Sequence, residues 1–304
     1  MEQVVDVVIR TTGQHERRVS LQRAIHSVLH QRGVAARPIV VLADNLPRLA
    51  AEIAAEHRVK VHVVGEPASP GRALGIGRTL IEADFYAFLD DDDELLPCAL
   101  DTRLDIMRAE PSVDMVVTTG YWLSGQQRRI HIPDITRHQD DAVNGIIERC
   151  WLHPGGGLYR ASTIPAHYFE ALPDLCEWTY LAFRLALNRH NIRFLDQPTY
   201  NAYDTPGSQS KTGKFVEAGL GVVTAMRAHT LPPAAREKLE DKYRAALHNT
   251  AEHYRQAEQW AKAWHLHLKS LMPPYTLRYA AYTRKLLWRR KAAQAERAPS
   301  ARPS

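Results

Sequence analysis

The sequence contains few cysteines and no long apolar run. Its three cysteines, Cys98, Cys150 and Cys176, form no CxxC pair and no even-numbered set, which is typical of reduced thiols in a cytosolic protein. No window approaches ~20 uninterrupted apolar residues, so no membrane-spanning helix is expected. The opening MEQVVDVVIRTTG carries an acid and no apolar stretch of signal-peptide length, so we do not expect a secretory leader. These absences together favour a cytoplasmic protein.

Acidic residues are almost missing from the C-terminal end. From Lys269 onward the sequence has nine lysines and arginines and one acid, Glu296, which gives this segment a net charge of +8. Because the whole chain carries +5, the first 268 residues carry −3. The basic character belongs to the tail, and the composition therefore argues against nucleic acid as a partner of the main domain.

Short β-branched runs alternate with helical patterns over the first ~120 residues, which is typical of a mostly parallel sheet covered by helices on both faces. Ligands of such sheets bind at the carboxyl ends of the strands. Ser20 is the expected N-cap of the first helix. Strands are expected at 4–9, 38–44, 59–64 and 85–89, and helices at 20–31, at 46–57 and within 70–83.

The pattern turns mixed between residue 97 and about residue 200 and then becomes helical. The mixed part predicts a strand at 115–123, a glycine-rich turn and strand at 153–162, a helix at 177–190 and a short strand at 192–196. After a polar, flexible loop at 206–214, apolar residues stepping by four and three predict an amphipathic helical stretch from Pro233 to the Pro273-Pro274 break. We therefore expect a catalytic domain at 1–215, a helical region with a basic amphipathic tail at 216–292, and a disordered end at 293–304.

The run FLDDDDELLP (88–97) places four aspartates and a glutamate directly behind an apolar strand. Close carboxylates raise one another's pKa unless a cation compensates. Asp90 and Asp92 are two residues apart and can face the same side, and Mg²⁺ or Mn²⁺ prefers such oxygens and keeps positions open for phosphate. A D-x-D at the end of a buried strand therefore indicates a metal–diphosphate site. A solvated acidic loop is the plain alternative. The acid-rich motif of isoprenyl diphosphate synthases is disfavoured, because it lies on a helix in an all-helical fold.

The acidic run and several other segments resemble family-2 glycosyltransferases, the inverting enzymes with the GT-A nucleotide-sugar fold. The resemblance covers roughly residues 3–210 and implies a Rossmann-like α/β domain that transfers a sugar from a nucleotide diphosphate. The acidic run resembles the family's D-x-D region, and the other segments occur in the family's order: VVDVVIRTTGQ, SLQRAIHSVLHQ, PIVVLAD, GRALGI (71–76), HPGGGLYR, CEW (176–178) and YDTPGS (203–208).

The resemblance implies a bound Mn²⁺ or Mg²⁺ at the acidic run. Asp90 and Asp92 are expected to hold the metal and the nucleotide sugar, with Asp92 as the direct ligand. Asp91 is also expected at the nucleotide sugar. Asp91 and Asp93 either hold the turn or contact the ribose or the sugar.

The remaining donor-side residues follow from the same resemblance. Thr11 and Asp44 are candidates for the nucleotide base, and Arg72 for the diphosphate, where a guanidinium forks onto phosphate oxygens. Many relatives carry a histidine before the Pro-Gly of the late loop, but this chain has Thr205 there. Asp204 is therefore the candidate third metal ligand, the alternative being a metal held by the D-x-D, diphosphate and water.

Glu177 is the candidate general base, because inverting transfer needs a carboxylate to take the proton of the acceptor hydroxyl. It stands where the family often has an aspartate, and Asp174 is the competing candidate. An acid favoured by the positive end of a helix is the structural alternative for Glu177. The acceptor-side candidates are His153, Gly156 and Trp178, of which His153 and Trp178 are equally suited to structural roles.

The basic, aromatic tail at 275–290 suits an anionic membrane surface. The alternative is a helix that packs its apolar stripe on the catalytic domain and leaves its basic residues in water. With a membrane contact, the protein would be peripheral on the inner face of the cell membrane.

The sequence as a whole predicts an inverting, metal-dependent glycosyltransferase. It would act on a glycan or lipid-linked acceptor, in the assembly of cell-surface glycans or glycolipids. An inactive protein of the same fold that serves as a nucleotide-binding module or scaffold is the alternative, because Cys176 and Thr205 depart from the family pattern. A nucleotidyltransferase is disfavoured, since RTTGQHERR lacks the dense glycines of such a loop.

Overall fold

The computed structural model of the protein describes residues 3–57, 59–205, 208, 212–272 and 278–287. The chain divides into two compact units, Met1–Lys211 and Thr212–Ser304. Most of the loop expected at 206–214 and the whole disordered end expected at 293–304 lie outside the described residues. The end of that expected loop is helical, because α7 begins at Gly213.

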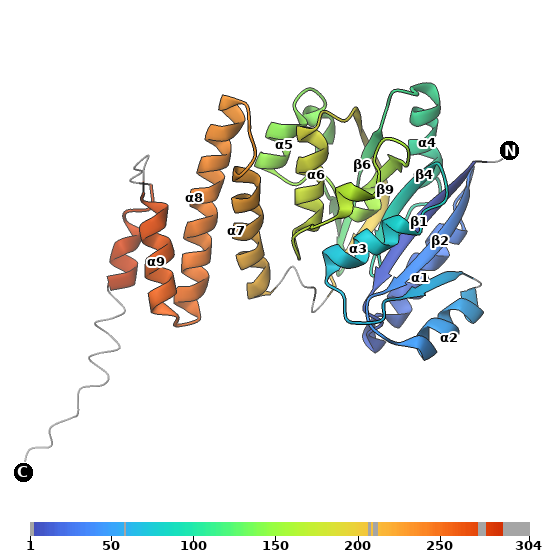
Figure 1. The fold of residues 1–304 in the computed structure, drawn as a ribbon, viewed down its shortest axis with the longest axis horizontal. Helices are drawn as coiled ribbons and strands as arrows, with labels where there is room; N and C mark the ends of the chain where they lie inside the picture. Colours follow the sequence, from blue (N-terminus) through green and yellow to red (C-terminus); the bar gives the residue numbers. More distant parts are fainter. Residues whose placement is uncertain (1–2, 58, 206–207, 209–211, 273–277, 288–304) are drawn as a thin grey trace, which may run out of the picture. The chain divides into compact units, whose positions relative to one another are not determined.

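The first unit is built on one sheet in the order β3-β2-β1-β4-β8-β6-β9-β5, with β7 paired to β6 (Figure 1). Its first four strands run parallel, because β1 pairs with both β2 and β4, and β2 pairs with β3. They are β1 (Val4–Thr11), β2 (Ala35–Leu42), β3 (Lys60–Val63) and β4 (Phe85–Asp90). All four expected N-terminal strands are therefore confirmed, and so is the parallel half of the predicted α/β fold.

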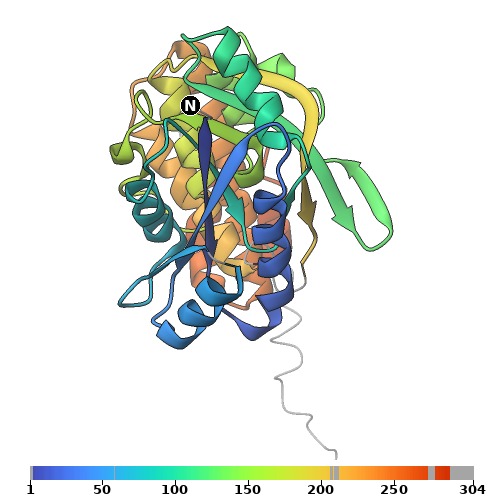
Figure 2. The ribbon, with the colours of Figure 1, turned by 90° about the vertical axis from the view of Figure 1, so that its right-hand side faces the viewer.

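The other half of the sheet is mixed, as the pattern beyond residue 97 predicted. β8 runs antiparallel to β4 and β6, whereas β6 and β9 run parallel. Figure 2 shows the hairpin of β6 and β7 extending from the sheet, and every residue of β7 is exposed. The expected short strand at 192–196 continues as β9 to Tyr203. These strands are β5 (Glu94–Leu95), β6 (Met115–Ser124), β7 (Gln127–Ile130), β8 (Gly157–Arg160) and β9 (Ile192–Tyr203).

Helices connect the strands and cover the sheet. The N-cap of the first helix is Arg17, so the prediction of Ser20 as N-cap was wrong: a short 3₁₀ turn at His15–Arg17 starts the helical path earlier, and the Ser20 hydroxyl donates to the Arg17 carbonyl. Ser69 caps the third helix through the Arg72 amide. The helices are α1 (Arg18–Leu29), α2 (Pro47–His57), α3 (Pro70–Thr79), α4 (Ala99–Ala109), α5 (Ala142–Glu148) and α6 (Glu177–Leu187).

The core explains why the central strands are mainly apolar on both faces. Alternate residues of β1 pack with the apolar face of α1, and Val8 points to the opposite side of the sheet, against α3. A Cβ at Gly77 of α3 would lie 2.5 Å from a Val8 methyl carbon, so glycine is what lets this helix approach the sheet. Buried on both faces, β1 and β4 hold their carboxyl ends in place, and these ends carry the site.

The second unit is helical. In it α7 (Gly213–Arg227) packs on α8 (Pro233–Gln256), and α8 packs on α9 (Trp260–Ser270). The expected helical stretch after Pro233 is interrupted, because Glu258 adopts a left-handed conformation with a φ of 59° and ends α8 before the next helix starts. Tyr282 and Leu286 of the tail pack with Ala251 and Ala263 in a small core. Residues 273–277 and 288–304 of the predicted tail lie outside the described residues. In the described part of the chain, no helix is long and apolar enough to cross a membrane.

Candidate functional site

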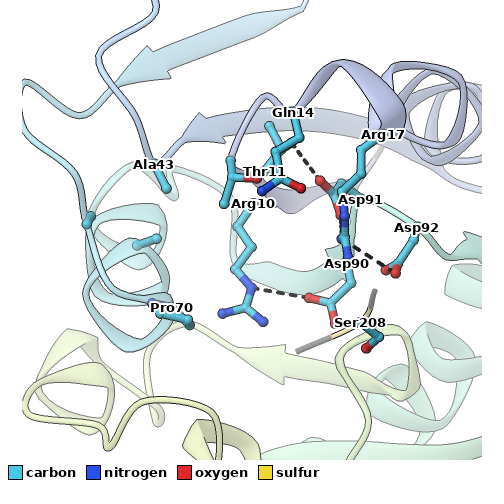
Figure 3. Close-up of a pocket in the computed structure, with 13 residues that line it drawn as sticks. Arg10, Thr11, Gln14, Arg17, Ala43, Pro70, Asp90, Asp91, Asp92 and Ser208 are labelled. Carbon is cyan, nitrogen blue, oxygen red and sulfur yellow. Dashed lines mark hydrogen bonds and ion pairs between the residues drawn. The ribbon is translucent and has the colours of Figure 1, made fainter. Parts of the chain in front are cut away.

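The acidic run lies at the carboxyl end of β4, beside a cavity of about 210 Å³ (Figure 3). β4 ends at Asp90, and the Asp93 amide donates to the Asp90 carbonyl at 3.2 Å, which closes a turn before β5 begins at Glu94. The β1 end and the loops after β2 and β3 complete the cavity, which is lined by Arg10, Thr11, Thr12, Gln14, Arg17, Ala43, Ala68, Pro70, Ala73, Asp90, Asp91, Asp92 and Ser208.

Asp91 holds the loop that follows β1. Its carboxylate accepts a hydrogen bond from the Thr11 hydroxyl at 2.6 Å and pairs with the Arg17 guanidinium at 2.5 Å. Burial raises the pKa of Asp91, and the Arg17 charge and the Thr11 hydrogen bond partly oppose this rise. The sequence left two roles open for Asp91, which were to hold the turn or to contact the ribose or the sugar. These contacts correspond to the first role.

Asp90, Asp92 and Asp93 bring carboxylate oxygens within 4.8 Å of one another. Burial is the main cause that raises the pKa of Asp90 to about 6, because the opposing charge of Arg10 compensates it only in part. Burial, followed by the charges of Asp92 and Asp90, also raises the pKa of Asp93 well above its ordinary value. Three oxygen ligands at this spacing, with more negative charge than their surroundings balance, fit a hard divalent cation such as Mg²⁺ or Mn²⁺.

Arg10 connects the acidic run to Glu177. Its Nε lies 3.3 Å from an Asp90 carboxylate oxygen, and another guanidinium nitrogen lies 2.7 Å from a Glu177 oxygen. Burial alone would lower the pKa of Arg10, but the charges of Asp90 and Glu177 raise it overall. Glu177 is the first residue of α6 and only 3% exposed. The structure thus brings the candidate base and a candidate metal ligand to the same guanidinium.

The glycine-rich segment lies on the other side of Asp93. The His153 Nε2 is 3.5 Å from an Asp93 oxygen, and the His153 ring stacks on Tyr200 with centroids 4.5 Å apart. Burial lowers the pKa of His153 well below its ordinary value, so this ring is neutral. A Cβ at Gly156 would lie 2.8 Å from the Thr118 carbonyl oxygen, so only glycine fits that close approach. His153 and Gly156, two of the three acceptor-side candidates, therefore stand at one packed wall, which His153 joins to Asp93.

Several predicted residues lie apart from the acidic cluster. Arg72 is exposed and pairs with Glu66 at 2.7 Å, and neither Arg72 nor Asp44 lines the cavity. Asp204 accepts a hydrogen bond from Ser124 and is not a member of the three-carboxylate group found among the described residues. Thr11 does line the cavity, although its hydroxyl is engaged by Asp91.

The two remaining candidates also lie outside the cavity lining. Trp178 packs edge-on against Phe88 of β4, with ring centroids 5.3 Å apart, as expected for a core residue. Asp174 is exposed, whereas Glu177 is buried and paired, so Glu177 is the carboxylate that the fold places toward the acidic run.

Sequence reasoning missed both arginines of the cavity. Arg10 is the penultimate residue of β1, and Arg17 ends the 3₁₀ turn that follows that strand. For Arg10 the signal was present in the sequence, because it stands near the carboxyl end of a strand between two parallel neighbours, at the edge where ligands of such sheets bind.

Comparison with known proteins identifies a family and similar folds. Residues 8–158 match the model of a family described as glycosyl transferase family 2. The comparison with curated proteins finds no match.

Among solved structures, the chain is similar to S. aureus TarS 1-349 in complex with UDP-GlcNAc. The identity is 16%, the TM-score is 0.57, and the match covers 84% of this chain and 73% of that one. The complex of TarS 1-349 with UDP gives 16% identity and a TM-score of 0.52, covering 83% and 72%. A longer TarS structure gives the same identity and TM-score, and this chain spans 49% of it. At such identities the likeness concerns the fold.

The fold predicted from the sequence is therefore confirmed on two independent grounds, a family model and the TarS structures. The chain belongs to glycosyl transferase family 2 through a domain that covers residues 8–158.

Proposed function

We propose that the protein is an inverting, metal-dependent glycosyltransferase that moves a sugar from a nucleotide diphosphate to an acceptor hydroxyl. The observation that carries the proposal is the group of Asp90, Asp92 and Asp93 at the end of a central buried strand, next to a cavity and within reach of a buried glutamate. Ligands of parallel sheets bind at this edge.

The three carboxylates would hold Mn²⁺ or Mg²⁺. When bound, the cation neutralises charge that develops on the leaving diphosphate. Asp92 is the best direct ligand, because Asp91 is committed to Thr11 and Arg17, and Asp93 accepts the Tyr203 amide at 3.0 Å. The carboxylate of Asp92 has one described ion pair, with Arg17 at 3.5 Å.

The nucleotide would occupy the cavity between the loop after β1 and the start of α3. Small side chains form one wall, including Ala43, Ala68 and Ala73, and leave room for a flat base. Two of the TarS structures contain UDP-GlcNAc or UDP, so a uridine diphosphate sugar is the first donor to test. Thr11 and Asp44 remain our candidates for the base, and Arg72 for the diphosphate.

Glu177 would act as the general base. The acceptor oxygen attacks the anomeric carbon and forms the new glycosidic bond, while the bond from that carbon to the diphosphate oxygen breaks. The electron pair of the broken bond leaves with the nucleotide diphosphate, and the acceptor proton passes to the Glu177 carboxylate. Such proton transfer is typically worth ~10²–10⁴ in rate.

The acceptor would lie against the wall of His153 and Gly156, next to Asp93, with Trp178 as our further candidate on that side. A glycan or lipid-linked acceptor in cell-surface assembly remains our proposal. A peripheral contact with an anionic membrane is supported by the helical unit, where Leu268, Met272 and Leu287 are exposed near Lys269 and Lys285 in the sequence.

The proposal is tested by incubating the protein with UDP-GlcNAc and other nucleotide sugars, with MnCl₂ or EDTA, and measuring release of the free nucleotide. We expect release with at least one donor and its loss after chelation. Nucleotide binding without release from any donor would instead support the inactive module of the same fold.

A further inference from the structure

Arg10 makes contacts that a simple cavity-lining residue would not need. It leaves β1 near the carboxyl end, and its guanidinium points toward Asp90 across the cavity (Figure 3). The same guanidinium reaches Glu177, which lies 167 positions later in the chain, at the start of α6. One side chain therefore spans the two acids to which the proposed function assigns different steps.

The contact with Arg10 is the ion pair that the structure gives the Glu177 carboxylate. The Glu177 side chain is 4% exposed, and among the described residues Arg10 is the cation that pairs with it. Its second oxygen, Oε2, is buried and has no hydrogen-bond partner among the described residues. A buried carboxylate with a free oxygen is costly unless a partner compensates its charge, so the contact with Arg10 is what fixes its place.

The neighbouring arginine provides a contrast within the same cavity. Arg17 pairs with Asp91 and Asp92, and both of these ion pairs among the described residues lie in the acidic turn. The two arginines thus divide the acids between them. Arg17 holds the turn, whereas Arg10 joins the turn to the glutamate.

We infer that Arg10 is a positioning residue that holds the Glu177 carboxylate, and Asp90 with it, in the geometry needed for transfer. The inference rests on the proposed function, in which Glu177 is the base. A planar guanidinium presents its donors in a rigid fork and can hold two carboxylates in a fixed geometry, whereas a lysine ammonium is a compact charge on a flexible stem that fixes them less well. Arg10 acts through Glu177 and leaves the proton transfer to that carboxylate.

Steady-state kinetics of the full chain test this inference, with MnCl₂ and the donor that the wild-type protein turns over fastest. Losing one close contact between opposite charges typically costs about 10- to 100-fold, so Arg10→Met, which removes the ion pair with Glu177, should lower kcat by that factor and change the donor KM much less. Arg10→Lys should recover part of the loss. Arg32→Met, an exposed arginine after α1, should leave both parameters unchanged.

A double-mutant comparison separates positioning from a general structural role. If Arg10 acts through Glu177, adding Arg10→Met to Glu177→Gln should lower kcat by less than twofold further. Independent, multiplicative losses would overturn the inference, and so would a loss confined to the donor KM. If Arg10→Met does not fold, a wild-type kcat in Arg10→Lys overturns it. A wild-type protein that neither binds nucleotides nor releases them from any donor would defeat the proposed function itself, together with this inference.

Discussion

Two clusters of charged side chains, one in each unit, illustrate opposite uses of a carboxylate. In the helical unit, Glu252 is surrounded by donors: Arg255 pairs with it through both oxygens, the Tyr282 hydroxyl donates at 2.6 Å, and Lys285 at 3.3 Å. In the sheet unit, three of the four consecutive aspartates, Asp90 to Asp92, share the charges of Arg10 and Arg17.

The difference shows in the direction of the pKa shifts. The hydrogen bond from Arg255, followed by the other donors, lowers the pKa of Glu252, although burial opposes this. Burial and neighbouring acids raise the pKa values of Asp90 and Asp93. A carboxylate whose charge is matched stabilises the fold, whereas a group of carboxylates with excess negative charge favours a bound cation. We therefore read the Glu252 cluster as structural and the aspartate cluster as functional.

The largest expected effect follows from removing the proposed base. Glu177→Gln keeps the size and the buried position of the side chain but removes the charge that would accept the proton. We expect kcat for sugar transfer to fall by ~10²–10⁴, with nucleotide binding retained. Nucleotide release and calorimetric titration with UDP measure the two quantities separately.

Asp174→Asn is the matched control, because Asp174 is the rival acid three residues earlier and is exposed. It should transfer sugar at the wild-type rate. A wild-type rate in Glu177→Gln combined with a strong loss in Asp174→Asn would move the base to Asp174.

The next effect concerns the metal ligands. Asp92→Ala should lower transfer by about 10²–10³-fold, because stabilisation of the leaving group by a metal is worth several kcal/mol. The fold should remain, since Asp92 makes fewer contacts than Asp91 or Asp93, and its removal relieves repulsion in the run. Asp105→Ala, an exposed acid on α4, is the control and should behave as wild type in transfer and in thermal unfolding.

A smaller effect, on stability alone, is expected in the helical unit. Glu252→Gln should lower the free energy of unfolding by about 1–3 kcal/mol, because charge-assisted hydrogen bonds are lost, and should leave kcat unchanged. Since folding lowers the pKa of Glu252 below its ordinary value of 4.5, this stabilisation is complete above that pH and is lost progressively as the pH falls below it. Circular dichroism melts at neutral and acid pH measure the change.

Glu237→Gln, an exposed acid on the same helix, should melt as wild type at both pH values. A destabilisation by Glu252→Gln that persists unchanged at acid pH would contradict a charge-based origin. A loss of sugar transfer in Glu252→Gln would contradict the assignment of the Glu252 cluster to a purely structural role.

Much of the fold was predictable because the sheet unit follows local rules. β1, β2 and β4 are buried on both faces over most of their length, so their sequences are mainly apolar, and the helices between them have regular amphipathic spacing. The break after α8 was not predictable in this way, because apolar spacing continues across the left-handed Glu258. The predicted N-cap of α1 was wrong because the 3₁₀ turn before the helix has no signature in the apolar pattern.

The candidate site was predictable where one short segment carries it. Asp90 and Asp92 could be predicted from their position directly after an expected strand, and Glu177 could be predicted from the order of the segments that resemble the family. The different role of Asp91 follows from its contacts with Thr11 and Arg17, which lie 80 and 74 positions away in the sequence. The bridge by Arg10 likewise joins β1, β4 and α6, and such long-range contacts have no periodic signature.

Calorimetric titration of UDP into the wild-type protein and into Asp92→Ala, with MnCl₂ or with EDTA, tests the central claim most directly. The claim is that the aspartate cluster binds a divalent cation and a nucleotide diphosphate together. We predict a binding heat for the wild-type protein with MnCl₂ that EDTA abolishes and that Asp92→Ala loses, while Asp105→Ala keeps it. Equal UDP binding with and without metal, unchanged in Asp92→Ala, would contradict the account.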